Sequence, residues 1–177
     1  TGLLILCTGK MTKQLERFQA EEKEYEATFT IGKTTPSYDL ETEFDSDVNY
    51  HHVTQESMDK AIKELTGHLM QTPPVFSAIK KGGVPSYKKA RRKEEVKLDP
   101  RPVEIKEFEI ISTNLPEVNV RIVCSKGTYI RSLAHDFGQK IGVGAYLSRL
   151  VRTRIGEHKL SGAWQLETFV DRINSQQ

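Results

Sequence analysis

The chain has 177 residues, of which 37% are hydrophobic and 28% charged, and a formal net charge of +2. These values exclude a disordered chain and are typical of a single globular domain with a buried core, here residues 1–177. No apolar run approaches the roughly 18 residues that a membrane-spanning helix needs, so we expect no membrane partner.

The first part of the chain predicts a strand, a helix, a second strand and a loop. Residues 1–7 are apolar and predict a buried strand that begins in mid-element, so we expect a truncated or processed N-terminus. Residues 8–18 predict a short helix, and residues 25–32 predict a strand because apolar residues alternate there. The polar residues 33–50 predict a loop.

The middle of the chain predicts a helix and then an extended segment. Thr54 is the predicted N-cap of a helix that runs to about Leu65, with Gly67 beyond its end. Pro73 and Pro74 stop any helix, so residues 75–79 are expected to be extended.

The last part predicts paired strands and two helices. Residues 103–112 and 118–124 alternate like paired strands around a turn at residues 114–116. Apolar residues between 130 and 141 have helical spacing, and residues 166–173 predict a last short helix. The whole pattern predicts an α+β protein with a mixed, largely antiparallel sheet flanked by helices.

Neither a metal nor a cofactor is expected. Cys7 and Cys124 lie in apolar stretches without metal-ligand spacing, so we expect reduced core cysteines in a cytoplasmic protein. The histidines at 51, 52 and 68 do not form a zinc pattern. Gly82 and Gly83 are not followed by the Gly-Lys-Ser/Thr signature of a phosphate-binding loop, which argues against phosphoryl transfer.

The distribution of charge says more than its sum. Acidic residues gather between 41 and 47, and basic residues gather between 80 and 92 and again between 149 and 159. Basic clusters of this kind can steer RNA phosphates toward one face of a protein. Taken alone, such a run is more often a solvated surface.

The stretch Ser125-Lys-Gly-Thr-Tyr-Ile-Arg131 is the most informative in the chain. It follows a predicted strand, Gly127 permits a tight turn, and Thr128 is the predicted cap of the next helix. Arg131 would then project from the first helical turn, where an arginine can hold a carboxylate or a phosphate by two hydrogen bonds. A surface arginine beside a core tyrosine fits these residues equally well.

Five segments in order resemble the bacterial tRNA pseudouridine-55 synthases, the TruB family, over nearly the whole chain. They are Thr1-Gly-Leu-Leu-Ile-Leu-Cys-Thr-Gly-Lys-Met-Thr-Lys13; Lys23-Glu-Tyr25 with Gly32 and Asp39; Gln71-Thr-Pro-Pro-Val-Phe-Ser-Ala-Ile-Lys80 with Gly83, Tyr87, Ala90-Arg91 and Arg101-Pro-Val-Glu-Ile105; Lys126-Gly-Thr-Tyr-Ile-Arg131; and Gly142-Val-Gly-Ala-Tyr-Leu-Ser-Arg-Leu150. One such motif would be a weak signal, but five in the right order are highly specific.

The resemblance implies a pseudouridine synthase fold and the isomerisation of the T-loop uridine at position 55 of tRNA. The family's nucleophilic aspartate stands a few positions before the threonine that matches Thr1, so it is expected to be absent from this chain, which should then be inactive. Arg131 matches the arginine that pairs with that aspartate, and Tyr25 matches the active-site tyrosine. Tyr129 and Leu150 match residues of the pocket floor. Without the aspartate, we expect Arg131 to be more exposed or to pair with another anion.

Further residues are expected to bind the tRNA T arm. The resemblance gives this role to Asp39, Lys80, Tyr87, Arg91, Lys126 and Arg152. Residues 72–102 resemble the family's thumb-like RNA-binding insertion, which would order on binding RNA. No C-terminal RNA-binding domain is expected within residues 1–177, and a monomer is the expected state.

Two other functions remain open from the sequence. The chain could be an RNA-binding or RNA-folding module without catalysis, or a stable fragment that binds nothing well. A salt titration of T-arm RNA binding separates them, because phosphate contacts make binding salt-dependent.

Overall fold

The main element of the fold is one antiparallel sheet. The computed structural model describes residues 1–92 and 94–175, and within these residues the sheet has six strands in the order β10-β9-β1-β8-β7-β4. The strands are β1 (Lys23–Ile31), β4 (Gly67–Gln71), β7 (Arg101–Asn114), β8 (Glu117–Cys124), β9 (Ala145–Ile155) and β10 (His158–Lys159). Each neighbouring pair is antiparallel. The predicted α+β class with a largely antiparallel sheet is confirmed.

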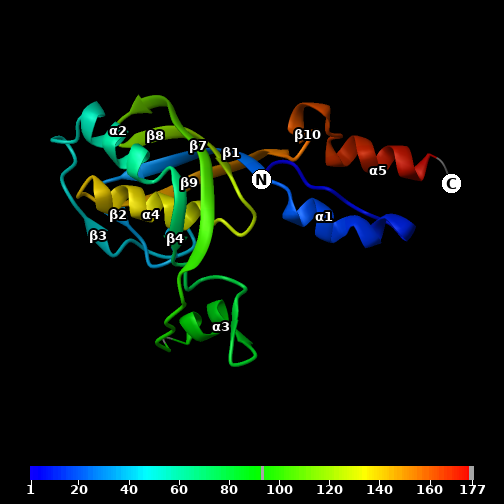
Figure 1. Ribbon diagram of the computed structural model, residues 1–177, viewed down its shortest axis with the longest axis horizontal. Helices are drawn as coiled ribbons and strands as arrows, with labels where there is room; N and C mark the ends of the chain where they lie inside the picture. The colour runs from blue at the N-terminus through cyan, green and yellow to red at the C-terminus, as the bar shows by residue number, and fades with distance from the viewer. Residues whose placement is uncertain (93, 176–177) are drawn as a thin grey trace.

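Two helices, α2 (Gln55–Glu64) and α4 (Ile130–Lys140), cover one face of this sheet (Figure 1). The core lies between them and the strands, because alternate residues of β1 point inward. Phe29 of β1 and Phe137 of α4 are fully buried, with ring centroids 5.8 Å apart. Burying a phenylalanine typically contributes about 1.5–3 kcal/mol, so this contact fixes α4 on the sheet.

Helix α2 begins where the sequence predicts. Thr54 is its N-cap: the Thr54 hydroxyl accepts a hydrogen bond from the Ser57 N–H, and the Ser57 hydroxyl lies 3.2 Å from the Thr54 N–H. This reciprocal pair satisfies two N–H groups that a helix leaves unpaired at its start. Met58 and Ala61 are buried in the core, and Leu65 ends the helix.

Strands β4 and β9 were missed by the sequence patterns, for different physical reasons. β4 has only five residues, and its inward face carries Leu69 and the polar Gln71, so it offers too few apolar residues for a recognisable alternation. β9 is long, but its pairing with β1 shifts register at two points, which place Thr153 and Ser148 outside the regular alternation. Such bulges break the period-2 pattern on which strand prediction depends.

The N-terminal predictions were wrong in detail. Residues 1–7 were expected to form a buried strand, but only Gly2 makes a bridge, a parallel one to Arg152 of β9. Leu3 is buried there, while Leu4 and Leu6 are 68% and 64% exposed. In place of the single helix predicted at residues 8–18, the chain forms a 3-10 helix, η1 (Gly9–Gln14), followed by a short α-helix, α1 (Leu15–Ala20).

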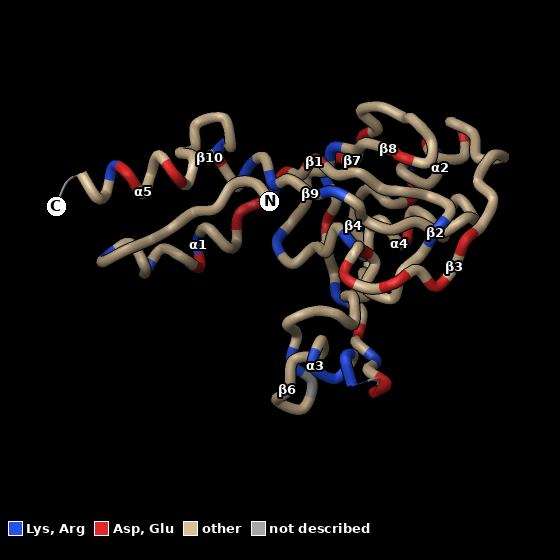
Figure 2. Tube along the Cα trace, turned by 180° about the vertical axis from the view of Figure 1, so that it is seen from behind, with Lys and Arg blue, Asp and Glu red and all other residues tan. Residues whose placement is uncertain are grey.

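Residues 72–102 project from the body below the sheet (Figure 1). They contain a small hairpin, β5 (Lys80–Lys81) with β6 (Val84–Pro85), and helix α3 (Ser86–Arg91). Residues 75–78, expected to be extended, form bends instead. Lysine and arginine gather in this projection (Figure 2). Residues 33–50 form the expected loop, apart from the two-residue strands β2 (Lys33–Thr34) and β3 (Ser46–Asp47).

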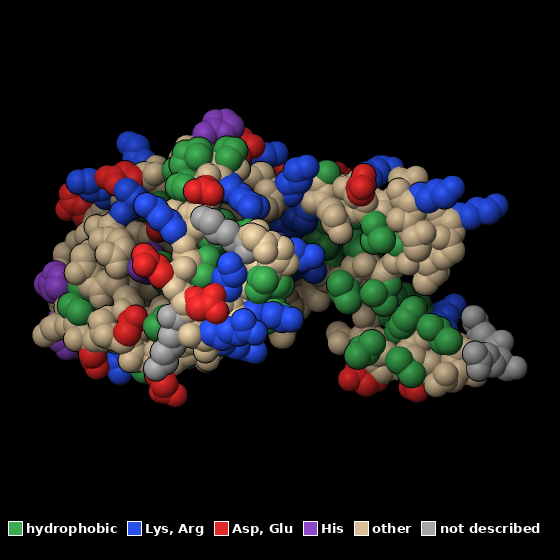
Figure 3. Space-filling model, turned by 90° about the horizontal axis from the view of Figure 1, so that it is seen from below, with side chains coloured by type: hydrophobic (Ala, Val, Ile, Leu, Met, Phe, Trp, Pro, Cys, Tyr) green, Lys and Arg blue, Asp and Glu red, His purple; other side chains and the backbone are tan. Residues whose placement is uncertain are grey.

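Two arms extend from the other end of the sheet, one formed by residues 1–20 and one by η2 (Leu160–Gly162) and α5 (Leu166–Asn174) (Figures 1 and 3). Among the described residues of α5 none is buried, and Leu166 is 68% exposed. The arms line a groove of about 1120 Å³ between residues 1–6 and 157–169. In the described part of the chain, no helix is long and apolar enough to cross a membrane.

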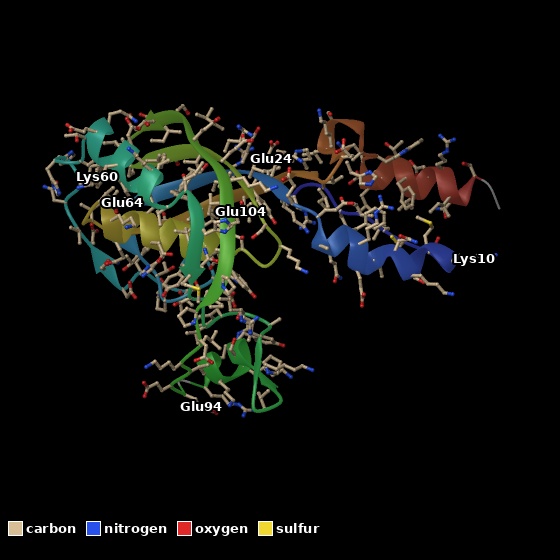
Figure 4. All side chains as sticks on the ribbon, viewed as in Figure 1. Lys10, Glu24, Lys60, Glu64, Glu94 and Glu104 are labelled. Carbon is tan, nitrogen blue, oxygen red and sulfur yellow. The ribbon has the colours of Figure 1, made fainter. Side chains whose placement is uncertain are left out.

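The face of the sheet opposite to the helices is held by ion pairs. Arg121 of β8 lies between Glu24 of β1 and the carboxylates of Glu107 and Glu109 on β7. Glu24 lies on β1 near the root of the arms (Figure 4). Together with Arg154, which approaches Glu24 at 3.8 Å, these groups link four adjacent strands.

Candidate functional site

The candidate site is built around Arg131, in the first turn of α4. Its Nη1 donates a hydrogen bond to Oδ2 of Asp39 at 2.9 Å, and its Nη2 donates to the backbone carbonyl of Phe76 at 3.0 Å. The two side chains are only 21% and 23% exposed. The expectation that Arg131 pairs with another anion is confirmed, and that anion is Asp39.

Asp39 is held in place by its own loop. The carbonyl of Asp39 accepts hydrogen bonds from the hydroxyls of Thr35 at 2.7 Å and Ser37 at 3.2 Å. Its carboxylate also accepts the Glu41 N–H at 2.9 Å. Asp39 further forms a parallel bridge to Leu147, which fixes the loop against the edge of β9. The carboxylate therefore reaches Arg131 from a rigid support.

A second contact joins the same loop to α4 one turn further on. Tyr38, which has a φ of 64°, stacks on His135 with ring centroids 4.0 Å apart. Burial raises the pKa of the Tyr38 hydroxyl and lowers the pKa of His135. Burial also raises the pKa of the neighbouring Asp136 to about 6. Because residues 131 and 135 share one helix face, the loop meets α4 at two successive turns.

Tyr25, Leu150 and Arg152 lie together on two paired strands. Tyr25 of β1 is opposite Arg152 of β9, and Ala27 is opposite Leu150, so all of these side chains share the face that bears α4. Burial raises the pKa of the Tyr25 hydroxyl, and its hydrogen bond to Arg152 acts in the opposite direction. The Nε of Arg152 also donates to the Leu3 carbonyl at 2.8 Å.

The turn from β8 into α4 brings this face close to Arg131. β8 ends at Cys124, which is opposite Lys23 of β1, and α4 begins six residues later. The helix starts one residue later than predicted, with Tyr129 as N-cap, because the Thr128 hydroxyl donates to the Ser125 carbonyl instead. Tyr25 is therefore two residues from the level at which β8 turns toward Tyr129 and Arg131.

Lys23 lies on β1 beside Tyr25, and the sequence reasoning gave it no role of its own. Its ammonium donates to the carbonyls of Phe18, Gln19 and Glu21 at 3.3, 2.6 and 2.6 Å, which fixes the end of α1. Burial lowers its pKa, and the positive charge of Arg152 lowers it further. The signal that could have found it is its spacing: two residues before Tyr25, it shares the same face of β1.

The remaining predicted residues lie outside this cluster. Lys80, Tyr87 and Arg91 belong to the projecting 72–102 segment, and Lys126 is exposed in the turn before α4. Arg91 does connect back to the site loop, because its Nη2 donates to Glu41 at 2.9 Å. The same guanidinium lies over the Tyr87 ring, 5.6 Å from its centroid.

The first residues of the chain run along the free edge of β9. The Thr1 ammonium and hydroxyl donate to the Leu150 carbonyl at 3.2 and 3.0 Å, and the Leu3 N–H donates to the Arg152 carbonyl at 2.8 Å. Three residues further along that edge, the Leu147 N–H donates to the Tyr38 carbonyl at 2.9 Å. Thr1 and the Asp39 loop therefore flank one short open stretch of β9.

Metal ligands are not gathered here: among the described residues, no group of three or more His, Cys, Asp or Glu could hold a metal ion. The chemistry available here is that of a fixed arginine, a carboxylate, a half-buried phenol and a half-buried leucine. A fixed arginine can orient an anion, and an aromatic ring can stack on a planar base.

Comparison with solved structures finds the same fold. The chain superposes on a protein chain in the crystal structure of a Cbf5-Nop10-Gar1 complex with a TM-score of 0.69 and 25% sequence identity. The match covers 96% of this chain and 41% of the chain in that complex. A chain of an H/ACA RNP bound to a substrate RNA containing 2'-deoxyuridine matches with a TM-score of 0.57 and 23% identity, over 86% of this chain and 34% of that one. Both comparisons cover well under half of the larger chains.

Curated relatives match over nearly the full length. A protein of Bacteroides fragilis named tRNA pseudouridine synthase B is 47% identical over 176 residues, which is 99% of this chain and 76% of that protein. A protein of the same name from Flavobacterium johnsoniae is 47% identical over 173 residues, 98% of this chain and 76% of the relative. The family described as TruB family pseudouridylate synthase (N terminal domain) matches residues 1–130. The chain therefore belongs to the TruB family of pseudouridylate synthases.

Proposed function

We propose that the protein converts the T-loop uridine at position 55 of tRNA to pseudouridine. The observation that carries this proposal is the 47% identity, over 99% of the chain, to a relative named tRNA pseudouridine synthase B. The reaction breaks the glycosidic bond, turns the base over and forms a carbon–carbon bond to the same sugar. A carboxylate nucleophile divides this change into two steps.

The proposal assigns the other requirements of that reaction to residues of the site. In this proposal Arg131 keeps the nucleophilic carboxylate ionised and oriented, Tyr25 stacks on the flipped uracil, and Leu150 with Tyr129 forms the floor that retains the detached base. Flipping the base costs roughly a few kcal/mol, and stacking on an aromatic ring returns about 1–3 kcal/mol. The half-buried position of Tyr25 suits a ring that is covered by a base.

We further propose that the nucleophile belongs to a segment that precedes Thr1 in relatives. A strand that continued residues 1–3 backwards along β9 would reach the level of Leu147 about four residues before Thr1, because Gly2 bridges Arg152 in parallel register. That level carries the Asp39–Arg131 pair. Asp39 would then hold Arg131 in place until the nucleophilic carboxylate pairs with it.

The 72–102 segment is proposed to grip the T arm as a thumb. Lys80, Lys88 and Lys89 bring positive charge to it, and its Arg91 reaches the Asp39 loop through Glu41. Lys126 and Arg152 extend the positive charge toward the site. RNA bound by the segment would thereby lie over the end of the sheet where Arg131 is held.

The test is tritium release from T-arm RNA labelled at uracil C5. It compares the chain with a version extended by the residues that precede the match to Thr1 in the Bacteroides fragilis relative. A matched control carries the same extension with its aspartate changed to asparagine. Turnover by the extended version alone supports both proposals. Turnover by the chain itself would place the nucleophile within its 177 residues.

A second function, RNA binding without catalysis, is favoured by one observation: Arg131 already pairs with the Asp39 carboxylate and donates to the Phe76 carbonyl. If the chain and its extended versions all bind T-arm RNA in a salt-dependent way and none turns over, RNA binding without catalysis is established. Absence of salt-dependent binding would leave only a fragment that binds nothing well.

A further inference from the structure

Gln71 is a buried amide at the end of β4, and it faces the beginning of α4. Its side chain is 3% exposed. Its Nε2 donates a hydrogen bond to the Tyr129 carbonyl at 3.1 Å, and its Oε1 accepts the Tyr129 N–H at 2.8 Å. One planar side chain thus pairs with both backbone groups of a single residue, as a neighbouring strand would.

This pairing acts where the helix is weakest. Tyr129 is the N-cap of α4, and its carbonyl also accepts the Leu133 N–H at 3.1 Å, the first hydrogen bond of the helix. The N–H groups at a helix start have no partners within the helix, so an outside acceptor fixes the direction of the first turn. Arg131 belongs to that turn.

Two more contacts tie residues 71–76, which form the stem of the projecting segment, to α4. The Ser132 hydroxyl donates to the Thr72 carbonyl at 2.8 Å, and Nη2 of Arg131 donates to the Phe76 carbonyl at 3.0 Å. Residues 71–76 therefore accompany residues 129–132 as one unit. This stem leads directly into the basic segment that begins at Lys80.

We propose that Gln71 is a positioning residue for the isomerisation: by fixing the backbone of Tyr129 it sets the direction in which Arg131 projects. The inference rests on the proposed function. Gln71 acts through Arg131 and touches no RNA, so its loss should lower the rate of the chemical step and leave RNA affinity in place. A residue that only filled the core would change stability alone.

Two variants separate these roles. Gln71→Met keeps the length of the side chain and removes both hydrogen bonds. Gln71→Glu keeps the acceptor, and its carboxyl regains the donor only when it is protonated. Gln139→Met is the matched control, because Gln139 lies exposed near the other end of α4. The assay is tritium release by the version that turns over, at a temperature where circular dichroism shows each variant folded.

We expect Gln71→Met to lower kcat at least tenfold with KM for T-arm RNA within about threefold of wild type, and Gln139→Met to change neither. Activity of Gln71→Glu relative to wild type should rise several-fold as the pH falls from about 8 to about 5.5, because burial raises the pKa of the new carboxyl. If Gln71→Met does not fold, the proposal is tested by the pH dependence of the activity of Gln71→Glu relative to wild type. A folded Gln71→Met with kcat within twofold of wild type, or a flat pH ratio, overturns the proposal.

A readout without turnover keeps this inference separate from the proposed function. In the chain itself, the Tyr129 amide should exchange with solvent at least tenfold faster in Gln71→Met than in wild type or Gln139→Met. If no version of the wild type turns over, the proposed function fails, and unchanged Tyr129 exchange would then overturn the hydrogen-bonding role of Gln71 as well.

Discussion

The beginning of α4 and the two arms are held in opposite ways. At α4, polar side chains are largely buried and have specific partners: Arg131 is 21% exposed and binds both Asp39 and the Phe76 carbonyl. On the arms, apolar side chains stay exposed along the groove between the two arms, with Leu6 and Leu166 64% and 68% exposed. The first region is defined by tertiary contacts between distant segments, the second mainly by local helix formation. Substitutions should therefore have large effects at α4 and small ones on the arms.

The largest effect is expected at Arg131. Arg131→Lys should lower turnover about a thousandfold, equivalent to about 4 kcal/mol, because an ammonium cannot make the two directed hydrogen bonds of a guanidinium. T-arm RNA affinity should stay within about threefold. Single-turnover tritium release measures the first, and filter binding the second.

The control for this substitution is Arg149→Lys on β9. Arg149 is exposed and opposite Thr28, on the face of the sheet away from Leu150. It should turn over like the wild type. A loss of less than tenfold in Arg131→Lys would show that positive charge alone suffices, and that the two-point geometry has no catalytic role.

One leucine on α4 and one on α5 test whether side-chain burial contributes more to stability at α4 than on the arms. Leu133 of α4 is 0% exposed and Leu166 of α5 is 68% exposed. Leu133→Ala should lower the free energy of unfolding by about 3–5 kcal/mol through lost burial and a cavity. Leu166→Ala should change it by less than about 0.5 kcal/mol. Urea unfolding followed by circular dichroism gives both values. Equal losses would mean that the arms are part of the cooperative core.

Asp136 provides a pH test of burial near the site. Its pKa is raised to about 6 by burial, against an ordinary value of 3.8. A raised carboxyl pKa means that the fold favours the protonated form, so this contribution to stability is full below about pH 4 and is lost as the pH rises through about 6. Asp136→Asn, which cannot ionise, should therefore stabilise the protein at pH 7 by about 1–2 kcal/mol and leave it unchanged near pH 4.

The arm supplies the control for Asp136. Asp171 of α5 is exposed, so Asp171→Asn makes the same change of side chain on the surface and should alter thermal stability little. Thermal melts between about pH 4 and pH 8 compare the two variants with wild type. If Asp136→Asn gave the same gain at every pH, its effect would not come from ionisation.

Local patterns predicted the elements that local physics defines. The alternation in β1, the Thr54 cap and the apolar stripe of α4 each follow from side chains within a few residues of one another. Asp39 and Arg131 are 92 residues apart, and their ion pair depends on β9 carrying the Asp39 loop. A periodic pattern within a short segment cannot predict a contact between residues so far apart in the chain. The resemblance to the TruB family named both residues, but the pair between them needed the fold.

The limits of local patterns are also visible in the arms. Residues 1–7 have the apolarity of a buried strand, yet of their hydrophobic side chains only Leu3 is buried, and Leu4 and Leu6 are exposed. Apolarity predicts that a residue prefers burial and cannot say which surface provides it. The exposed apolar side chains of α5, among them Leu166 and Ile173, have the same origin.

The smallest effect concerns RNA affinity, and it compares two exposed lysines. Lys80 lies in the basic projecting segment, and Lys10 lies at the far end of the N-terminal arm (Figure 4). Lys80→Gln should weaken T-arm binding about threefold and reduce the slope of log affinity against log salt by about 0.7–0.9, the effect of one phosphate contact. Lys10→Gln removes the same charge and should change neither quantity. Equal effects of the two variants would mean that RNA responds to the net charge of the protein, whereas an effect at Lys80 alone would show that the RNA contacts the projecting segment and not the arm.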